Sequence, residues 1–255
     1  MFFERRENLF IGRFAELFLN QVVFHGFSTR KGGVSDSSYH SLNLGSRTGD
    51  APSRVAENRR RFFHSIGIRK QNLALPQQVH GDRVERVAKP GRYENTDGLV
   101  TNVRGIVLTI QVADCLPVFL YDPLRNAVGL VHAGWRSTEL GIVSKGVAKM
   151  AHHFQTNPTD LWVFFGPSIG PCCYEIGPEA ARRFSAKYIS QGRLDLWQCN
   201  RDQLLDAGVL PHKIEMSCLC TVCHPEWFFS HRASGGRTGR MMAVIGLRDK
   251  KRSFQ

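Results

Sequence analysis

Residues 105–137 have the sequence GIVLTIQVADCLPVFLYDPLRNAVGLVHAGWRS. Two runs in this stretch, 105–112 and 116–121, are β-branched and apolar enough to form buried strands. The DPLRN segment at 122–126 is typical of a turn, and AVGLVH at 127–132 then fits a return strand. We therefore predict a hairpin of buried strands.

The flanking sequence mixes further strands and helices. We expect strands at 22–27, 161–166 and 241–246. We expect a helix at 50–66 with Gly67 as its C-cap, and a second from Ser137 and Thr138 to about Phe154 with Leu140 on its apolar face. A third should begin at Pro178. A fourth should follow a capping box of Asn200 and Gln203 and end at Gly208. Because no linker or internal repeat separates these elements, we predict an α/β fold with a mixed sheet and one domain over residues 1–255.

The composition is that of a globular protein: 42% of the 255 residues are apolar and 22% are charged. No apolar run is long enough to predict a membrane-spanning helix, and MFFERRENLF at the N-terminus lacks the pattern of a secretory signal. We therefore expect a cytoplasmic protein with no membrane partner. In a reducing compartment, metal binding, catalysis or burial explains the seven cysteines better than disulfides do.

The formal net charge of +12 indicates either an anionic partner or a solvated basic surface. The basic residues concentrate at Arg59–Arg61, Arg232–Arg240 and Arg248–Arg252. Because the sequence has no zinc finger, RNA-recognition signature or basic stripe with interleaved aromatics, we expect no nucleic-acid partner.

The predicted hairpin suggests a metal site at its open end. Cys115 lies nine residues before Leu124, near the turn centre, and His132 lies eight residues after it. Directly opposed residues of antiparallel strands have Cα atoms about 4.5–5.5 Å apart, so both side chains could reach one zinc ion. His80, in PQQVHG, is the candidate third ligand. Three protein ligands leave the fourth position for water or substrate, as in catalytic zinc sites.

The same residues allow a reading without metal. In it Cys115 is a nucleophile and His132 is its base. Asp114, beside the cysteine, could orient a histidine, accept a proton or form a turn.

The CLCTVCH segment at 218–224 resembles a metal knuckle, since Cys220 and Cys223 have C-x-x-C spacing. Cys218 and His224 flank this pair. The usual second pair is missing nearby, and Cys172 and Cys173 would supply it only if the fold brings them close. The alternative is a strand with incidental thiols.

Two glycine-rich segments and one aromatic motif offer possible substrate contacts. Backbone N–H groups of GPSIGPCCYE, or of the segment Arg30–Gly33, could cradle an anion or form a turn-rich connector. In HAGWRS, Trp135 could stack on a planar substrate and Arg136 could pair with an anion, or the tryptophan could pack a strand-to-helix turn.

Taken together, these motifs resemble one protein family. They are TRKGGVS, SLNLG with TGD and ENRRR, PQQVHG, ADCLPVFLYD, VHAGWRS, GPSIGPCCYEIG, LDLW with NRDQLLDAGV, and CT with FFSHR and TGR. In this order, from about His25 to Ile245, they are similar to the multicopper polyphenol oxidoreductase-like family. That family is also called the laccase-domain, or YfiH-like, purine nucleoside phosphorylases.

The resemblance implies an α/β sandwich related to cysteine hydrolases, with zinc held by His80, Cys115 and His132. It implies phosphorolysis of adenosine, inosine, guanosine and methylthioadenosine to the free base and a sugar 1-phosphate, with adenosine deamination as a side activity. Copper is a possible metal, because earlier family names came from a polyphenol oxidase activity. Some relatives are linked to editing of peptidoglycan precursors.

From the resemblance and the residues together we expect Cys115 and Asp114 to be catalytic. We expect substrate contacts from Arg30, Asn43, Arg47, Trp135 and Arg136. Cys218 and Cys223 lie outside the family pattern, which counts against the knuckle, and His231 and Ala233 depart from it at FFSHR. The partners expected are purine nucleosides and phosphate, for a monomer or a homodimer.

Overall fold

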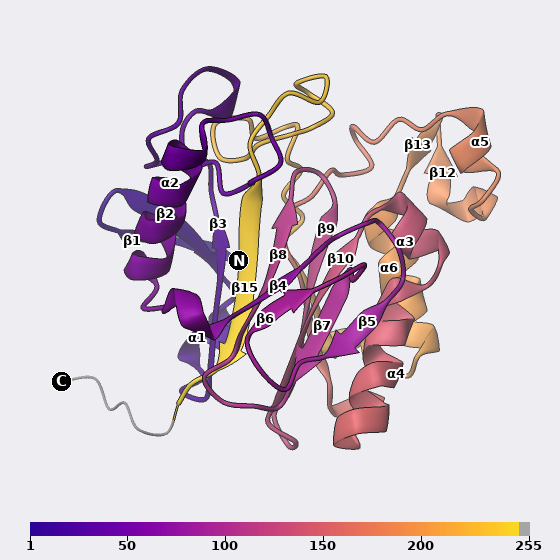
Figure 1. Cartoon of the computed structure of the whole chain (residues 1–255). Helices are drawn as coiled ribbons and strands as arrows, with labels where there is room; N and C mark the ends of the chain where they lie inside the picture. Colours follow the sequence, from indigo (N-terminus) through magenta and orange to yellow (C-terminus); the bar gives the residue numbers. More distant parts are fainter. Residues whose placement is uncertain (250–255) are drawn as a thin grey trace.

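The structure is a computed structural model that describes residues 1–249, and it contains two large β-sheets packed face to face (Figure 1). The first has seven strands in the order β1 (Phe2–Arg6), β2 (Leu9–Arg13), β3 (Val23–Ser28), β15 (Met241–Leu247), β8 (Val107–Val112), β4 (Leu73–Pro76) and β6 (Gly91–Tyr93). The second has six, in the order β14 (Ile214–Met216), β11 (Trp162–Phe165), β9 (Leu116–Asp122), β10 (Ala127–Ala133), β7 (Gly98–Thr101) and β5 (Val84–Arg86). Both sheets contain parallel and antiparallel pairs, which confirms the prediction of a mixed α/β fold.

Helices cover the outer faces of both sheets. The α-helices are α1 (Ala15–Leu19), α2 (Pro52–Ser65), α3 (Trp135–Glu139), α4 (Ile142–Phe154), α5 (Pro178–Ala181) and α6 (Leu196–Asp206). Short 3-10 turns lie at Ser37–Tyr39, Lys70–Asn72, Pro158–Asp160, Ala186–Tyr188 and Pro211–Lys213. Helix α2 packs on the seven-stranded sheet, whereas α4 and α6 pack on the six-stranded sheet. None of these helices is long and apolar enough to cross a membrane.

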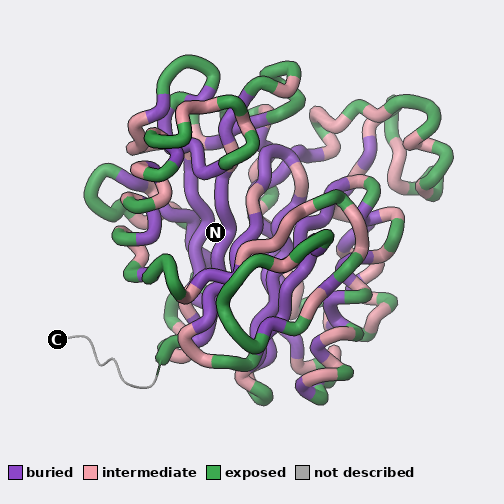
Figure 2. The backbone as a smooth tube through the Cα atoms, in the orientation of Figure 1, coloured by how far each residue is buried: buried purple, intermediate pink, exposed green. Residues whose placement is uncertain are grey.

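The core between the sheets explains why the central strands were recognisable. In β9, Phe119 and Tyr121 face the other sheet, whereas Val118 and Leu120 pack towards the helices. Strands that are buried on both faces have nearly continuous apolar sequences. Figure 2 shows this burial along the strands. The chain passes from β8 in one sheet directly to β9 in the other, so the two sheets belong to one domain.

A small lobe projects beside the six-stranded sheet (Figure 1). It contains α5 and the two-stranded sheet of β12 (Ile189–Ser190) and β13 (Arg193–Leu194). The chain enters the lobe after β11, and the return path begins with α6. Of the three predicted basic segments, the last extends beyond the described residues, because Lys250–Arg252 lies outside them.

Two predicted helices differ from the structure. The helix expected from Ser137 and Thr138 to Phe154 is divided into α3 and α4 at Gly141, which has φ +73°. Glycine adopts this left-handed conformation without strain. As a result Leu140 is exposed rather than on an apolar face.

The predicted capping box of Asn200 and Gln203 is also wrong. Helix α6 begins at Leu196, and its N-cap is Asp195, whose side chain accepts the Gln198 N–H at 2.9 Å. Asn200 lies inside the helix, buried, and its side-chain amide donates to Thr138 Oγ1 at 3.0 Å. A capping residue and a buried amide look alike in the sequence, because only the tertiary partner distinguishes them.

Candidate metal centre

Three predicted ligands converge where the loop after β4, the β8–β9 connection and the end of β10 meet. The potential donor atoms of His80, Cys115 and His132 all lie within 4.8 Å of one another. The rings of the two histidines have centroids 4.9 Å apart, edge to face. The structure therefore brings together the set of residues that the sequence suggested.

The predicted hairpin is confirmed, and Cys115 and His132 lie near each other at its open end, as expected. In the β9–β10 pair His132 lies opposite Pro117, and Cys115 lies just before the first residue of β9. Cys115 and His132 are thus diagonal rather than directly opposed. Diagonal neighbours share one face of a sheet, so their side chains still meet.

Gly134 allows the donors to approach one another. A Cβ at this position would lie 3.1 Å from Cys115 Sγ and 3.1 Å from His80 Cδ2. Any larger residue would therefore push two of the donors apart. The glycine of the HAGW motif is explained by this close approach.

Asp97 organises two of the three donors, although the sequence analysis did not identify it. Its buried carboxylate accepts the backbone N–H groups of Val79, His80 and Gly81 at 2.9–3.0 Å. One of its oxygens also lies 2.8 Å from His132 Nδ1. This contact fixes the imidazole orientation and leaves Nε2 free for a metal, as outer-shell carboxylates do in metal sites. The only sequence signal was an aspartate directly before a buried strand.

The electrostatics favour a thiolate at Cys115. Burial by itself would raise the pKa of Cys115, but the adjacent His132 and His80 outweigh it and lower the pKa to about 6. Burial likewise opposes protonation of His132, but the Cys115 thiolate and Asp97 raise its pKa. For Asp97, the hydrogen bond and the charge of His132 outweigh burial and lower the pKa. A deprotonated thiol is the form that binds metals.

The donor set fits a metal ion with an open position. One thiolate and two imidazoles are common ligands of zinc, and three protein ligands are typical of catalytic rather than structural sites. The same three donors are also found around copper. The side chains of this chain therefore support a metal without fixing its identity.

The donors line a cavity of about 600 Å³. Six arginines also line it, namely Arg47, Arg59, Arg92, Arg136, Arg232 and Arg240. Glu94 and Asp114 are the carboxylates that line the same cavity. Such an excess of guanidinium groups suits an anionic substrate, because guanidinium groups pair well with phosphate oxygens.

Several predicted substrate residues do lie at this cavity. Arg47, Trp135 and Arg136 line it, as does Asp114. The Arg136 guanidinium lies 4.4 Å from the centroid of the Trp135 ring, so it covers part of that ring. Arg59, Arg232 and Arg240 belong to basic segments that the sequence singled out, whereas nothing in the sequence indicated Arg92.

Asp114 holds loops together at the cavity wall. Its carboxylate accepts the Thr221 hydroxyl at 2.6 Å and the Arg232 backbone N–H at 2.7 Å. Its backbone carbonyl accepts the Ile169 N–H at 2.9 Å. Of the roles considered for this residue, orientation of a histidine is performed by Asp97 instead.

Arg30 and Asn43, which the sequence suggested as substrate contacts, do not line this cavity. The Arg30 guanidinium donates to the carbonyls of His40 and Pro225, each at 2.9 Å, and lies over the Phe229 ring. Asn43 is buried, and its side-chain oxygen accepts the Arg240 backbone N–H at 2.9 Å. Both residues therefore hold loops in place, and Asn43 positions a segment that carries a cavity arginine.

Comparison with known proteins gives one consistent result. Residues 24–248 match the family model described as multi-copper polyphenol oxidoreductase laccase. The chain is 34% identical to purine nucleoside phosphorylase YlmD of Bacillus subtilis over 251 residues, which cover 90% of each protein. It is 36% identical to the protein of the same name from Geobacillus stearothermophilus, covering 88% of this chain and 90% of the relative. The crystal structure of Bacillus licheniformis hypothetical protein YfiH aligns with a TM-score of 0.88 at 34% identity, covering 96% of this chain and 99% of that one.

Proposed function

Because the chain belongs to the family described as multi-copper polyphenol oxidoreductase laccase and is similar to proteins named purine nucleoside phosphorylase, we propose that it is a zinc-dependent purine nucleoside phosphorylase. The observation that carries the proposal is the cavity, which combines a three-donor metal centre with six arginines. A nucleoside phosphorylase needs to hold a phosphate ion beside a nucleoside, and the arginines offer the charge for it.

The reaction transfers a sugar from the base to phosphate. An oxygen of phosphate forms a bond to the anomeric carbon, and the bond from that carbon to the purine breaks. The electron pair stays with the purine, which takes up a proton, and the products are the free base and the sugar 1-phosphate. Zinc held by His80, Cys115 and His132 would supply a Lewis acid facing the cavity.

The side chains of the cavity have distinct parts in this scheme. Arg47 and Arg136, both exposed at the cavity, bind the incoming phosphate together with the other arginines of its wall. Trp135 offers the uncovered part of its ring to the planar base. The Asp114 carboxylate accepts the Arg232 backbone N–H and so keeps the Arg232 segment in place. This is a positioning role, whereas the sequence also suggested proton transfer.

The substrates expected are adenosine, inosine, guanosine and methylthioadenosine, with deamination of adenosine as a side activity. We expect the protein to act in the cytoplasm, as a monomer or homodimer without nucleic-acid or membrane partners. Product analysis of each nucleoside, with and without phosphate, separates phosphorolysis from deamination, because only the former needs phosphate.

The test is base release from inosine by zinc-loaded protein. Release should require phosphate, and Cys115→Ser should lose both the activity and the metal of this centre. The matched control is Cys218→Ser, which removes an exposed thiol that is not among the donors of either cysteine-containing cluster. Phosphate-independent release, or full turnover by Cys115→Ser after its metal is lost, would contradict the proposal.

A second function is favoured by one observation. Asp97, His132 and Cys115 form a relay in which the aspartate orients the histidine and the histidine lowers the pKa of the thiol. This is the arrangement of a cysteine hydrolase, here one that would act on amides of peptidoglycan precursors. It predicts hydrolysis by the metal-free protein and inactivation when Cys115 is alkylated.

The family description also raises oxidation of polyphenols with copper. The donors of the centre are compatible with copper. Metal analysis of protein purified without added metal, with a polyphenol oxidation assay on the same sample, distinguishes this activity from phosphorolysis.

A further inference from the structure

A second cluster of metal-binding side chains lies at the base of the projecting lobe. The sulfur atoms of Cys172, Cys173, Cys220 and Cys223 all lie within 4.8 Å of one another. The first two come from the loop after β11, and the last two come from the loop after β14. The sequence named both pairs but could not show that they meet, because they are almost fifty residues apart. We propose that these four cysteines bind a structural zinc ion.

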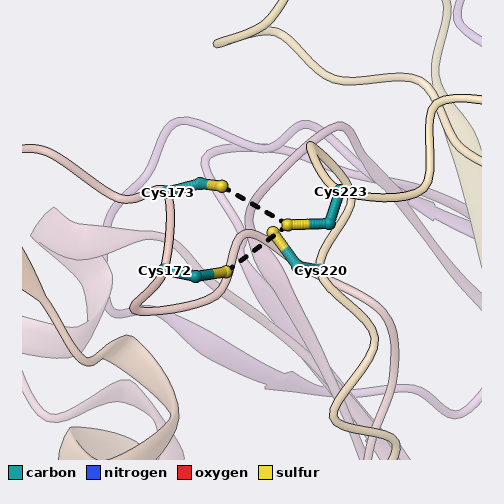
Figure 3. Close-up of side chains that lie close together, drawn as sticks. All are labelled: Cys172, Cys173, Cys220 and Cys223. Carbon is teal, nitrogen blue, oxygen red and sulfur yellow. Dashed lines mark hydrogen bonds between the residues drawn. The ribbon is translucent and has the colours of Figure 1, made fainter.

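The sulfur positions fit tetrahedral coordination. Figure 3 shows all four side chains pointing towards one another from the two loops. Cys223 Sγ lies 3.6 Å from Cys172 Sγ and 3.5 Å from Cys173 Sγ. A zinc ion with four Zn–S bonds of about 2.3 Å places its sulfurs about 3.8 Å apart. The observed separations are close to this value, and much longer than the roughly 2.05 Å of a disulfide bond.

The surrounding backbone supports a bound thiolate. The Gly170 N–H donates to Cys220 Sγ at 3.3 Å, and thiolate ligands of metals are commonly stabilised by such hydrogen bonds. Ser168 and Cys220 also form a parallel β-bridge, which joins the two loops next to the cluster. A Cβ on Gly170 would lie 2.8 Å from the Trp197 ring and 3.3 Å from Cys172 Sγ. The loop is therefore held closely against α6 at the point where it presents its cysteines.

The cluster contains four of the six residues that the sequence considered for a knuckle. Cys218 and His224 flank the C-x-x-C pair but are not among the grouped donors. His224 instead lies 3.5 Å from Glu226, as an ion pair when it is protonated. The ligands are the C-x-x-C pair and the adjacent cysteines of the glycine-rich loop.

This site would join two loops and stiffen one wall of the cavity. Strands β11 and β14 are paired in parallel, so a metal there joins the two loops that follow these neighbouring strands. Ile169 and Tyr174, on either side of the Cys172–Cys173 pair, line the cavity. Thr221, beside Cys220, donates to Asp114. All four ligand positions are filled by protein, so the role is structural rather than catalytic.

The experiment measures zinc in protein purified under reducing conditions. Wild-type chain should bind about two zinc ions, and Cys115→Ser should retain about one, held by the four thiolates. Cys172→Ser and Cys223→Ser, which replace exposed residues, should each retain about one, at the His80–Cys115–His132 centre. Cys218→Ser is the matched control from the same loop and should bind as much zinc as wild type.

Cobalt substitution gives a readout that does not depend on any activity. Cobalt in Cys115→Ser should show intense tetrahedral visible bands and thiolate-to-cobalt charge transfer, and Cys223→Ser placed in this background should abolish both. If a variant fails to fold, zinc titration of metal-free wild-type protein still tests the proposal. Binding that saturates at one zinc ion, and that disappears when Cys115 is alkylated, would contradict it. Three other results would also overturn the proposal. They are an undiminished zinc content in Cys223→Ser, a Cys172–Cys223 disulfide in reduced protein, and iron bound in place of zinc.

Discussion

The His80–Cys115–His132 centre and the four-cysteine cluster differ in what their donor atoms face. The centre has three donors, is supported by the Asp97 carboxylate, and lies on the wall of a cavity of about 600 Å³. The cluster has four thiols from two loops, and none of its cysteines lines that cavity. The number of donors and the neighbouring space thus separate a metal that can meet a substrate from one that joins two loops.

The largest expected effect is at the exposed ligand of the open centre. His80→Ala should lower phosphate-dependent base release by about 10³-fold or more, because losing a ligand exceeds the 10–100-fold cost of losing an outer-shell partner. His152→Ala, which replaces an exposed histidine on α4, should leave activity unchanged. Equal losses in both variants would show that His80 has no special role.

Replacing Asp97 tests the support beneath two ligands. Asp97→Asn keeps the shape but removes the charge next to His132, so metal affinity or activity should fall about 10–100-fold. The four-cysteine cluster should keep its zinc, which is measurable in the same sample. Loss of metal from both sites together would indicate global unfolding, and thermal denaturation would reveal it.

The cavity arginines should differ from those that hold loops. Arg136→Ala should raise the KM for phosphate about tenfold, the effect of losing one charge-assisted hydrogen bond of about 1.5 kcal/mol. Arg30→Ala should leave this KM unchanged, because Arg30 lies outside the cavity. A phosphate KM that responds to Arg30→Ala but not to Arg136→Ala would place the anion elsewhere.

The metal-free centre should respond to pH through Cys115. Its pKa is depressed to about 6, so the thiolate and the stability that it contributes persist well below the pKa of an ordinary thiol, about 8.5. That contribution is complete above the unfolded-state pKa and is lost as pH falls through about 6. The rate of Cys115 alkylation in chelator-treated protein should therefore reach its plateau by neutral pH. A rate that still rises steeply above pH 8 would refute the lowered pKa.

The smallest effect is expected at Cys218, which neighbours the cluster without belonging to it. Cys218→Ser should change the free energy of unfolding by no more than about 0.5 kcal/mol, as is usual for an exposed position. Its left-handed backbone, with φ +52°, is no less accessible to serine. A chemical denaturation curve shifted as far as that of Cys223→Ser would mean that the cluster has been assigned the wrong cysteines.

The sequence could predict features that depend on local pattern. Strands β8, β9 and β10 were found because burial on both faces makes them continuously apolar. The candidate ligands Cys115 and His132 followed from the hairpin that joins their strands, and His80 gained support only from the family motifs. Periodicity could place the two residues near each other, but it could not fix the diagonal register that the strands adopt.

Features that depend on distant segments could not be predicted in this way. Asp97 acts through residues 79–81 and 132, which meet only after both sheets form. The partnership of Cys172 and Cys173 with the C-x-x-C pair likewise requires the distant strands β11 and β14 to pair side by side. Arg30 looked like a phosphate ligand because a sequence does not show which backbone carbonyls a guanidinium will meet.

The central claim is that the open centre, and not the four-cysteine cluster, supports phosphorolysis. Its most direct test returns zinc to metal-free Cys223→Ser protein while hypoxanthine release from inosine is followed at saturating phosphate. Activity should rise with added zinc, stop rising at about one ion per chain, and vanish without phosphate. Full activity before any zinc is added, or release of base that ignores phosphate, would contradict it.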